Sequence, residues 1–473
     1  STRYGSSAAS DVYKRQNGYI MDHEQTFRTS GKNLIKLAIP LIGTHLANVA
    51  LGITDTIMMG WYSVTALAAL VLGNAYFFVF FLFGAGFAFA VQPLVASASS
   101  AGELKLARRY MRMGLWLSLI YASLFLPIFF NAEPILIILG QAPDISGYAE
   151  NYTRIIGFGL IPALWAMVIR FFLSGLHLTK VTLIITLTTV LLNIPLNYLL
   201  IFGNLGFPEL GVSGAAISSV IVQIITAVSI TAYAIRKLPE YKLLTRFFRF
   251  DKVAFVKVGT LGLPIGTSIV AETGLFTASS IMMGWFGAIT LAAHGIALQI
   301  ASVMFMIHLG LAEASTIKAG NAWGNRNLLL LKKGAKVAAS CSILFSLAAM
   351  TVLITFGDTL VSIYVDIDDP SRNQIIYTGA LLLVAAALFQ FVDGGQAMAL
   401  GLLRGIQDTT VPMLITILSY WLVGVPSAYF FAFVLNFEAI GIWAGLATGL
   451  GFAAILLGFR FVYLTNSNRK MPL

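Results

Sequence analysis

The chain has 473 residues, of which 58% are hydrophobic and only 11% are charged. Because soluble proteins carry about one charged residue in four, this composition excludes an ordinary soluble domain and indicates an integral membrane protein. The formal net charge of +10 would suit a nucleic-acid partner, but the placement of the charges along the chain argues against one.

The first segment, STRYGSSAASDVYKRQNGYI (residues 1–20), lacks the apolar core of a secretory signal. We interpret it either as a non-native leader ahead of a start at Met21 or as a short cytoplasmic tail. Residues 1–33 as a whole are expected to precede the first membrane span.

Apolar stretches then follow one another along the chain. A membrane-spanning helix needs roughly 20 predominantly apolar residues, and charged or turn-rich segments separate twelve stretches of this kind. The sequence therefore predicts an all-α integral membrane protein with twelve transmembrane helices. The predicted spans are residues 34–60, 64–96, 110–131, 153–174, 181–203, 212–235, 256–284, 289–317, 335–356, 375–403, 411–434 and 438–463.

Basic residues are distributed unevenly between the loops. If the chain starts in the cytoplasm, Arg154 and Arg372 are the only two of the 30 Lys and Arg on or beside outer loops. The positive-inside rule accounts for this asymmetry, so the charge predicts orientation and contact with lipid head groups rather than nucleic-acid binding. We expect a multi-pass protein of the cell membrane with both termini, including residues 464–473, in the cytoplasm.

The pentapeptide IMMGW occurs at residues 57–61 and again, unchanged, at 281–285. The same shift of 224 positions aligns Pro40 with Pro264 and Gly86 with Gly310, and a shift of 230 aligns residues 174–180 with 404–410. The chain thus contains two related halves, residues 34–235 and 253–463, joined by a basic cytoplasmic linker at 236–252. With six spans per half the repeats are parallel, and sites are expected between or within two pseudo-symmetric lobes.

Each half begins with a helix that carries an internal proline, Pro40 or Pro264. A proline removes one backbone hydrogen bond, and neighbouring glycines permit bending. We predict that these two helices bend during transport, the alternative being a static kink that improves packing.

Four acidic residues fall within predicted spans: Asp55, Glu272, Glu313 and Asp393. An ionised acid in the membrane needs a partner, water or a function. At about 1.5 Å per residue, Glu272 and Asp393 both lie near mid-membrane, where they could share a site. Glu313 lies five residues from Lys318, so pairing with a base of the inner loop is expected for it.

Helical spacing places further polar side chains beside the acids. Gln390, Asp393 and Gln396 form one strip on the tenth span, and Ser268, Glu272 and Ser279 share one side of the seventh. In the repeat, Glu272 aligns with Asn48 and Ser279 with Asp55. We therefore expect one polar cavity in each half, and assign Asn48, Asp55, Asn193 and Asn197 to the first.

Carboxylates and amide oxygens suit hard cations, and a desolvated carboxyl group also carries a proton. Glu272 and Asp393 are thus predicted to bind Na⁺, H⁺ or both, and no other cofactor is expected. The alternative is that they only hydrogen-bond neighbouring helices. His294, at the start of the eighth span, is either a helix-packing donor or a coupling contact.

Four segments together resemble the multidrug and toxic compound extrusion (MATE) transporters, in particular their NorM branch: TDTIMMG (54–60), AETGLF (271–276), LAAHGIALQ (291–299) and FQFVDGGQ (389–396). The resemblance implies two six-helix lobes, a drug cavity between them, and export coupled to inward Na⁺ or H⁺ flow. It implies cation-site roles for Glu272 and Asp393 and an amino-terminal cavity role for Asp55. Glu313 departs from the family pattern, in which a small apolar residue is expected.

The sequence therefore predicts a monomeric antiporter that exports cationic amphipathic compounds by alternating access. The main alternative is a lipid-linked oligosaccharide flippase, disfavoured because no Lys or Arg lies in the middle of a span. A major-facilitator transporter is disfavoured because the basic-acidic signature expected between the second and third spans is absent from residues 99–112. An enzyme would need a nucleophile–base pair or a metal cluster, and the sequence offers neither.

Overall fold

The computed structural model describes residues 27–466, so the interpretation of residues 1–20 lies outside the described part. Within that part the chain is helical and contains no strand. The helices are α2 (Phe27–Tyr62), α3 (Val64–Ser100), α4 (Leu104–Phe129), α5 (Ala132–Ile138), α6 (Pro143–Gly175), α7 (Thr179–Phe202), α8 (Gly211–Lys237), α9 (Lys252–Gly284), α10 (Ala288–Gly324), α11 (Leu328–Thr355), α12 (Gly357–Ser362), α13 (Arg372–Gly405), α14 (Thr410–Leu418), α15 (Val425–Tyr429) and α16 (Glu438–Asn466).

Twelve helices in residues 27–466 are long and apolar enough to cross a membrane, one for each predicted span. Most extend beyond the predicted apolar stretch, because a helix continues into polar flanking turns. α6, for example, begins at Pro143 with Asp144 in its first turn, a favourable start because proline suits the first helical position and an acid suits the helix dipole.

The eleventh span, Thr410–Val434, is not a regular α-helix. Two π-helical segments, η3 (Ser419–Gly424) and η4 (Phe430–Val434), alternate with α14 and α15. Such wide turns are rare and frequently occur at functional sites. Here η3 carries Tyr420, which is fully buried, and Trp421, which is exposed.

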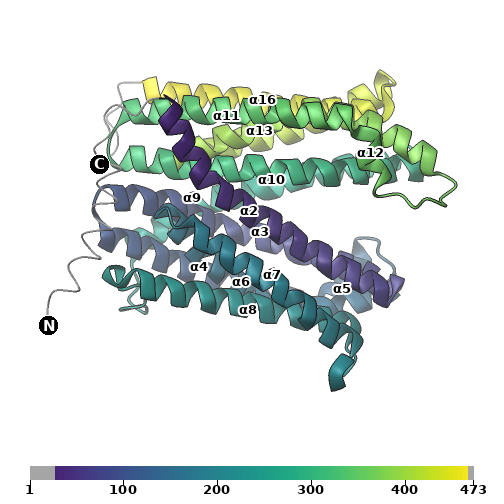
Figure 1. The fold of residues 1–473 in the computed structure, drawn as a ribbon, viewed down its shortest axis with the longest axis horizontal. Helices are drawn as coiled ribbons and strands as arrows, with labels where there is room; N and C mark the ends of the chain where they lie inside the picture. The colour runs from purple at the N-terminus through teal and green to yellow at the C-terminus, as the bar shows by residue number, and fades with distance from the viewer. Residues whose placement is uncertain (1–26, 467–473) are drawn as a thin grey trace.

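The helices form two lobes, which we call the N-lobe (α2–α8) and the C-lobe (α9–α16). Figure 1 shows α10, α11, α13 and α16 on one side and α3, α4, α6, α7 and α8 on the other, with α2 crossing obliquely between them. The first helix of each lobe contacts the other lobe: α2 packs against α7 and α10, and α9 packs mainly against α3. The two lobes are therefore joined by their first helices, α2 and α9, each of which packs against a helix of the other lobe.

The repeat seen in the sequence is also a symmetry of the contacts. A Cβ atom on Gly86 would lie 2.5 Å from the amide nitrogen of Gly266, and a Cβ atom on Gly310 would lie 2.8 Å from that of Ile42. The shift of 224 that relates Gly86 to Gly310 also relates Ile42 to Gly266. Glycine is needed at both positions because only a residue without a side chain lets the helix backbones approach so closely.

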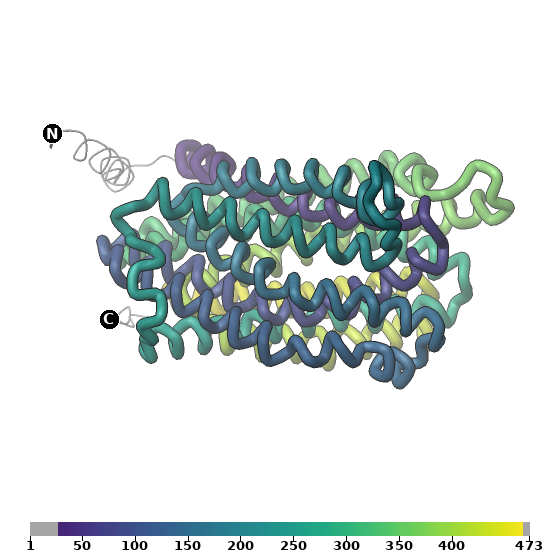
Figure 2. The backbone as a smooth tube through the Cα atoms, turned by 90° about the horizontal axis from the view of Figure 1, so that it is seen from below, coloured from purple at the N-terminus to yellow at the C-terminus, as the bar shows by residue number. Residues whose placement is uncertain are grey.

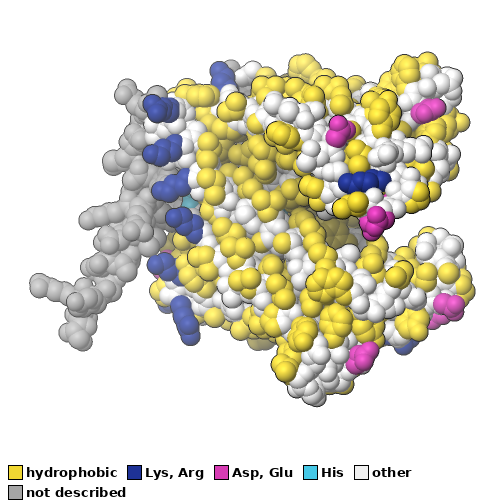
Figure 3. Space-filling view, turned by 45° about the vertical axis from the view of Figure 1, so that its right-hand side comes forward, with side chains coloured by type: hydrophobic (Ala, Val, Ile, Leu, Met, Phe, Trp, Pro, Cys, Tyr) yellow, Lys and Arg dark blue, Asp and Glu magenta, His cyan; other side chains and the backbone are white. Residues whose placement is uncertain are grey.

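Charged side chains gather at the ends of the bundle. α2 begins and α16 ends at the same end (Figures 1 and 2). Lys and Arg line this end, which we call the basic end, whereas Asp and Glu appear at the opposite, far end in Figure 3. The segment between α8 and α9 lies at the basic end on α4, where Arg112 donates to the carbonyls of Thr245 and Arg246.

Candidate transport sites in the two lobes

The two mid-membrane acids predicted to act together do lie close to each other, inside the C-lobe. Asp393 of α13 is only 2% exposed, and the charge of Glu272 on α9 is near enough to repel it. Gln396 reaches Glu272 from one turn further along α13. Two adjacent carboxylates in a buried site repel each other, so either a cation binds between them or one of them takes up a proton.

Several buried oxygen atoms on α13 and η3, the elements that carry Asp393 and Tyr420, have no hydrogen-bond partner among residues 27–466. They are Asp393 Oδ1, Gln396 Oε1, Gln390 Oε1, Ser419 Oγ and Tyr420 Oη. Buried polar atoms are nearly always hydrogen-bonded, so a cluster of exceptions calls for an explanation. Oxygen ligands of this kind suit a hard cation, and the described residues contain no group of three or more His, Cys, Asp or Glu that could hold a metal ion. The donor set fits Na⁺ or a proton.

Neighbouring side chains complete the C-lobe cluster. Ser268 of α9 is 3.3 Å from the hydroxyl of Thr416, and Gln390 donates its amide to the Ala301 carbonyl at 3.0 Å. Tyr420 lies near both carboxylates, and the guanidinium of Arg404 attracts Glu272. The sequence analysis did not identify Tyr420, although a tyrosine at mid-membrane is itself a signal because its hydroxyl needs a partner.

Two other predicted contacts, Ser279 and His294, have partners outside the pair of acids. The Ser279 hydroxyl donates to the Phe276 carbonyl one turn earlier, at 2.7 Å. His294 lies 3.3 Å from the Ser280 hydroxyl and edge-on to Trp443, with ring centroids 5.7 Å apart. Both are buried, and the other ring nitrogen of His294, Nδ1, has no hydrogen-bond partner among residues 27–466.

The N-lobe contains a second polar cluster, built around Asp55. Asn197 donates to Asp55 Oδ1 at 2.6 Å and to Asn193 Oδ1 at 3.2 Å, and Ser219 donates to Asp55 Oδ2 at 3.3 Å. Both carboxylate oxygens of Asp55 are thus bonded, in contrast to Asp393. Ser219 was not predicted, because its position on α8 relates to Asp55 only through the tertiary fold.

Asn48 does not belong to this cluster, which corrects the prediction. It shares a face of α2 with Asp55, but it is exposed. Figure 1 shows α2 crossing obliquely between the lobes, and α2 contacts both α7 and α10.

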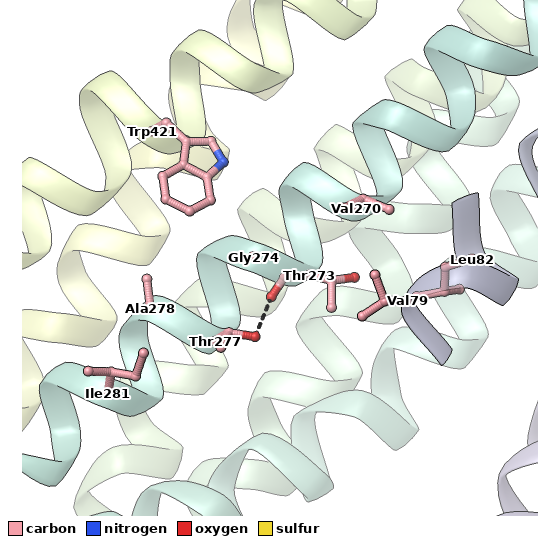
Figure 4. A pocket seen from close by; sticks show the side chains of 9 residues that line it. All are labelled: Val79, Leu82, Val270, Thr273, Gly274, Thr277, Ala278, Ile281 and Trp421. Atoms are coloured by element: carbon pink, nitrogen blue, oxygen red, sulfur yellow. Dashed lines mark hydrogen bonds between the residues drawn. The ribbon is translucent and has the colours of Figure 1, made fainter. Parts of the chain in front are cut away.

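A cavity of about 400 Å³ lies between the lobes (Figure 4). Its walls are Val79 and Leu82 of α3, Trp421 of η3, and the face of α9 formed by Val270, Thr273, Gly274, Thr277, Ala278 and Ile281. Figure 3 shows the surface hollowed between the lobes at the far end. Glu272 is not part of this wall, so α9 separates an apolar inter-lobe cavity from the acidic cluster in the C-lobe.

At the basic end, side-chain hydrogen bonds close the gap between the lobes. Glu313 of α10 accepts from His45 Nε2 at 3.0 Å and from Gln92 Nε2 at 2.9 Å. Eight residues on, Asn321 is bonded to Ser100 at 2.8 Å and to His177 at 2.6 Å. We call these six residues the basic-end clamp.

The partners of Glu313 correct the expectation that it pairs with a base of the inner loop. Lys318 follows five residues later, which turns it roughly 140° around the helix from Glu313. The carboxylate instead faces the N-lobe, where His45 and Gln92 bond it.

The sequence pattern that defines the MatE family matches residues 40–199 and again residues 264–430, so the two matches begin at the paired prolines. The chain belongs to the MATE transporter family. A probable multidrug resistance protein NorM from Rhizobium meliloti is 42% identical, over 96% of this chain and 97% of that protein.

Solved structures agree with the MATE fold. A MOP superfamily transporter from Pyrococcus furiosus superimposes with a TM-score of 0.85 at 20% identity, covering 93% of this chain and 97% of that one. A eukaryotic MATE transporter superimposes with a TM-score of 0.82 at 18% identity, covering 93% and 97%. These comparisons confirm twelve spans arranged as two six-helix lobes.

Proposed function

We propose that this MATE protein is a multidrug efflux antiporter that exports cationic amphipathic compounds in exchange for Na⁺ or H⁺. The observation that carries the proposal is the pair of carboxylates, Glu272 and Asp393, in a buried cluster of oxygens without partners. The name of the Rhizobium meliloti relative, a probable multidrug resistance protein, supports multidrug export. The basic end is assigned to the cytoplasm by the positive-inside rule, which puts both termini there.

The inter-lobe cavity is suited to the organic passenger. Aliphatic side chains and Trp421 line it, with Thr273 and Thr277 as polar groups. An aromatic face attracts a cation and stacks on an aromatic drug. The acids behind α9 add a negative potential without a direct contact. The drug and the coupling ion would then occupy neighbouring but separate sites.

Alternating access explains how two separate sites exchange their ligands. If the basic end faces the cytoplasm, the closed basic-end clamp and the hollow at the far end correspond to an outward-facing state. Neutralising Glu272 and Asp393 with a cation removes their mutual repulsion. If the outward-facing state binds the ion better and the inward-facing state binds the drug better, then bound ion lowers the affinity for the drug, and bound drug lowers the affinity for the ion.

The available driving force is sufficient for multidrug export. Moving one charge through 100 mV gives about 2.3 kcal/mol, and a tenfold ion gradient adds about 1.4 kcal/mol. Together they support a several-hundredfold gradient of a neutral drug. For a monovalent cationic drug exchanged one for one, the voltage contributions cancel and only the ion gradient remains.

The flippase alternative predicts basic side chains around the substrate to hold a pyrophosphate. Arg404 and Arg170 do lie in helices, but they attract Glu272 and Glu313, respectively. The inter-lobe cavity has no Lys or Arg in its wall. These features favour a cationic or neutral amphipathic passenger.

The test is efflux of a cationic dye from loaded proteoliposomes, driven first by a Na⁺ gradient alone and then by a proton gradient alone. Glu272→Gln and Asp393→Asn are each expected to abolish ion-driven efflux, while Asp358→Asn, an exposed acid, is expected to leave it unchanged. Wild-type coupling in either site variant would remove that residue from the proposed role.

A further inference from the structure

His308 of α10 is a buried histidine that the coupling mechanism above does not use. Its Nδ1 lies 3.3 Å from the Ser342 hydroxyl and its Nε2 lies 3.3 Å from the Ser346 hydroxyl, both on α11. The ring also packs on α13, since a Cβ atom on Gly394 would lie 2.6 Å from Nδ1. Gly394 directly follows Asp393 in the chain. The histidine therefore contacts the helical turn that carries one of the two proposed ion-binding acids.

The repeat shows how the same space is filled in the N-lobe. The shift of 224 aligns His308 with Gly84, and the shift of 230 aligns Gly394 with Leu164. A Cβ atom on Gly84 would lie 2.8 Å from Leu164 Cδ1, so these two residues also face each other. The N-lobe thus packs a leucine of α6 against a glycine of α3, and the C-lobe packs a histidine of α10 against a glycine of α13. The apolar pair is sufficient for packing alone.

The hydrogen bonds of His308 have no counterpart in the N-lobe. The shift of 224 aligns Ser342 with Ser118, which is buried and whose hydroxyl has no partner among residues 27–466. The same shift aligns Ser346 with Ala122. Burying an imidazole and two hydroxyls costs desolvation energy that an apolar pair does not. The arrangement in the C-lobe, the lobe that carries the paired acids, therefore calls for a role other than filling space.

Ser346 links the histidine to the backbone of α13. Its hydroxyl donates to the Gln390 carbonyl at 3.5 Å, so its oxygen accepts from Nε2–H of His308, and Nδ1 is the acceptor of the ring. The side-chain amide of Gln390 donates to a carbonyl of α10 at 3.0 Å. Residues 390 and 394 share a face of α13 because they are four positions apart. The turn that contains Asp393 is thus fixed to α10 and α11 through Gln390 and Gly394.

We propose that His308 is a positioning residue of the ion site, and that through Ser346 and Gly394 it holds Asp393 where it shares a cation with Glu272. This inference rests on the proposed antiport and adds the residue that orders its ion site before the ion binds. Both nitrogens of His308 are used by serines of α11, whereas Asp393 Oδ1 has no partner among residues 27–466. An ordered site binds its ligand more tightly, because less conformational freedom is lost on binding. Loss of these hydrogen bonds should therefore weaken ion binding and leave the inter-lobe cavity unchanged.

The test separates ion affinity from the maximal transport rate. Efflux of a cationic dye is recorded from loaded proteoliposomes that contain the full chain. The external NaCl concentration is raised in one series, and in a second series, without Na⁺, the external pH is lowered. Each variant yields a half-saturating NaCl concentration or a pH midpoint, a maximal rate and a KM for the dye.

Ser346→Ala is the first variant, because the N-lobe already has Ala122 at this place. We expect it to raise the half-saturating NaCl concentration about three- to tenfold, the effect of losing about one hydrogen bond. If H⁺ is the coupling ion, the pH midpoint should instead fall by about half a unit to one unit. The maximal rate and the KM for the dye should keep their wild-type values. Ser118→Ala is the matched control, since it removes a hydroxyl that has no partner within residues 27–466, and it should change none of these values.

A double variant separates the hydrogen bonds of His308 from its packing. His308→Gly combined with Gly394→Leu gives the C-lobe the apolar pair of the N-lobe and keeps one glycine in the contact. Its unfolding temperature should stay near the wild-type value, whereas His308→Ala, which leaves the space unfilled, should unfold at a lower temperature. The half-saturating ion concentration of the double variant should nevertheless rise at least as much as in Ser346→Ala. His308→Gln, which keeps a donor and an acceptor, should lie between the double variant and the wild type.

A half-saturating ion concentration at the wild-type value in either Ser346→Ala or the double variant overturns the positioning role and leaves His308 with packing alone. A reduced maximal rate with unchanged half-saturation overturns it as well. Failure of the antiport proposal shows in Asp393→Asn. If that variant keeps ion-driven efflux, both proposals fail. If it loses efflux while the His308 and Ser346 variants keep wild-type ion affinity, only the positioning role fails.

Discussion

Gly320 of α10 lies against Ala96 of α3, and each is the other's equivalent in the repeat, 224 positions apart. A Cβ atom on Gly320 would come within 3.1 Å of the Cβ atom of Ala96. Residues related by a twofold axis touch each other only where they meet that axis. The axis therefore passes between α3 and α10 near the basic end, and the clamp residues surround it.

The close contacts around this axis make a prediction about glycine at the lobe interface. In Gly86→Ala the new methyl group would lie 2.4 Å from the carbonyl oxygen of Gly262. Backbone atoms cannot rotate away, so we expect a loss of about 1–3 kcal/mol of stability, measured by thermal unfolding in detergent. Gly52→Ala is the control, since a Cβ atom there meets no neighbour within 4 Å. Equal stability of the two variants would contradict the tight interface.

The wall of the inter-lobe cavity supports a prediction about substrate binding. Trp421→Ala removes the aromatic face that borders the cavity. We expect the affinity for an aromatic cationic dye to fall by about tenfold, or about 1.4 kcal/mol, in a fluorescence titration of the purified protein. Trp61→Ala, at a tryptophan that is 74% exposed, should leave the affinity unchanged. An unchanged affinity in Trp421→Ala would place the dye elsewhere.

The twelve spans could be predicted because they depend on local composition. The repeat could be predicted because identical residues recur at a fixed sequence shift. The pairing of Glu272 with Asp393 could be predicted because depth and helical face follow from 1.5 Å and 100° per residue. The partner of Glu313 could not, because it depends on the oblique path of α2 across the lobes. Tyr420 was missed because the π-helical turns of η3 place it, and periodicity assumes a regular α-helix.

The start of α9 carries a pH-dependent contact outside the membrane-spanning segments. Asp251 caps the helix by accepting from the Ala254 amide at 3.1 Å, and it forms an ion pair with Arg109. The hydrogen bond from the Arg109 guanidinium holds the pKa of Asp251 below its ordinary value. A carboxyl group with a lowered pKa in the folded state stabilises the fold above its unfolded pKa and loses this effect as the pH falls.

Asp251→Asn keeps a capping side chain but loses the charge. We expect it to be less stable than the wild type by up to about 1 kcal/mol at neutral pH, with the difference disappearing as the pH falls below about 4. Thermal unfolding across a pH series measures this. Asp358→Asn, for which no ion pair is found in residues 27–466, should show no such trend, and a constant difference for Asp251→Asn would exclude the ion pair as its cause.

The two intramembrane aspartates are expected to respond in opposite ways to the loss of their charge. Asp55 has both oxygens bonded, to Asn197 and Ser219. In Asp55→Asn one oxygen can still accept from Asn197, but the other is replaced by an NH2 group that no longer accepts from Ser219, so stability should fall by about 1–3 kcal/mol. Asp393 has an oxygen without a partner and a second carboxylate beside it. Asp393→Asn removes that repulsion, so its stability without Na⁺ at high pH should equal or exceed that of the wild type.

The same two variants separate a structural acid from an ion-binding one. A ligand at a hundred times its dissociation constant stabilises the folded state by about 2.7 kcal/mol. Added Na⁺, or a lower pH if H⁺ is the coupling ion, should therefore raise the unfolding temperature of the wild type and of Asp55→Asn. Asp393→Asn should lose this response. If it keeps the response while Asp55→Asn loses it, the ion is bound by the N-lobe cluster, and the carboxylates of the C-lobe only hold helices together.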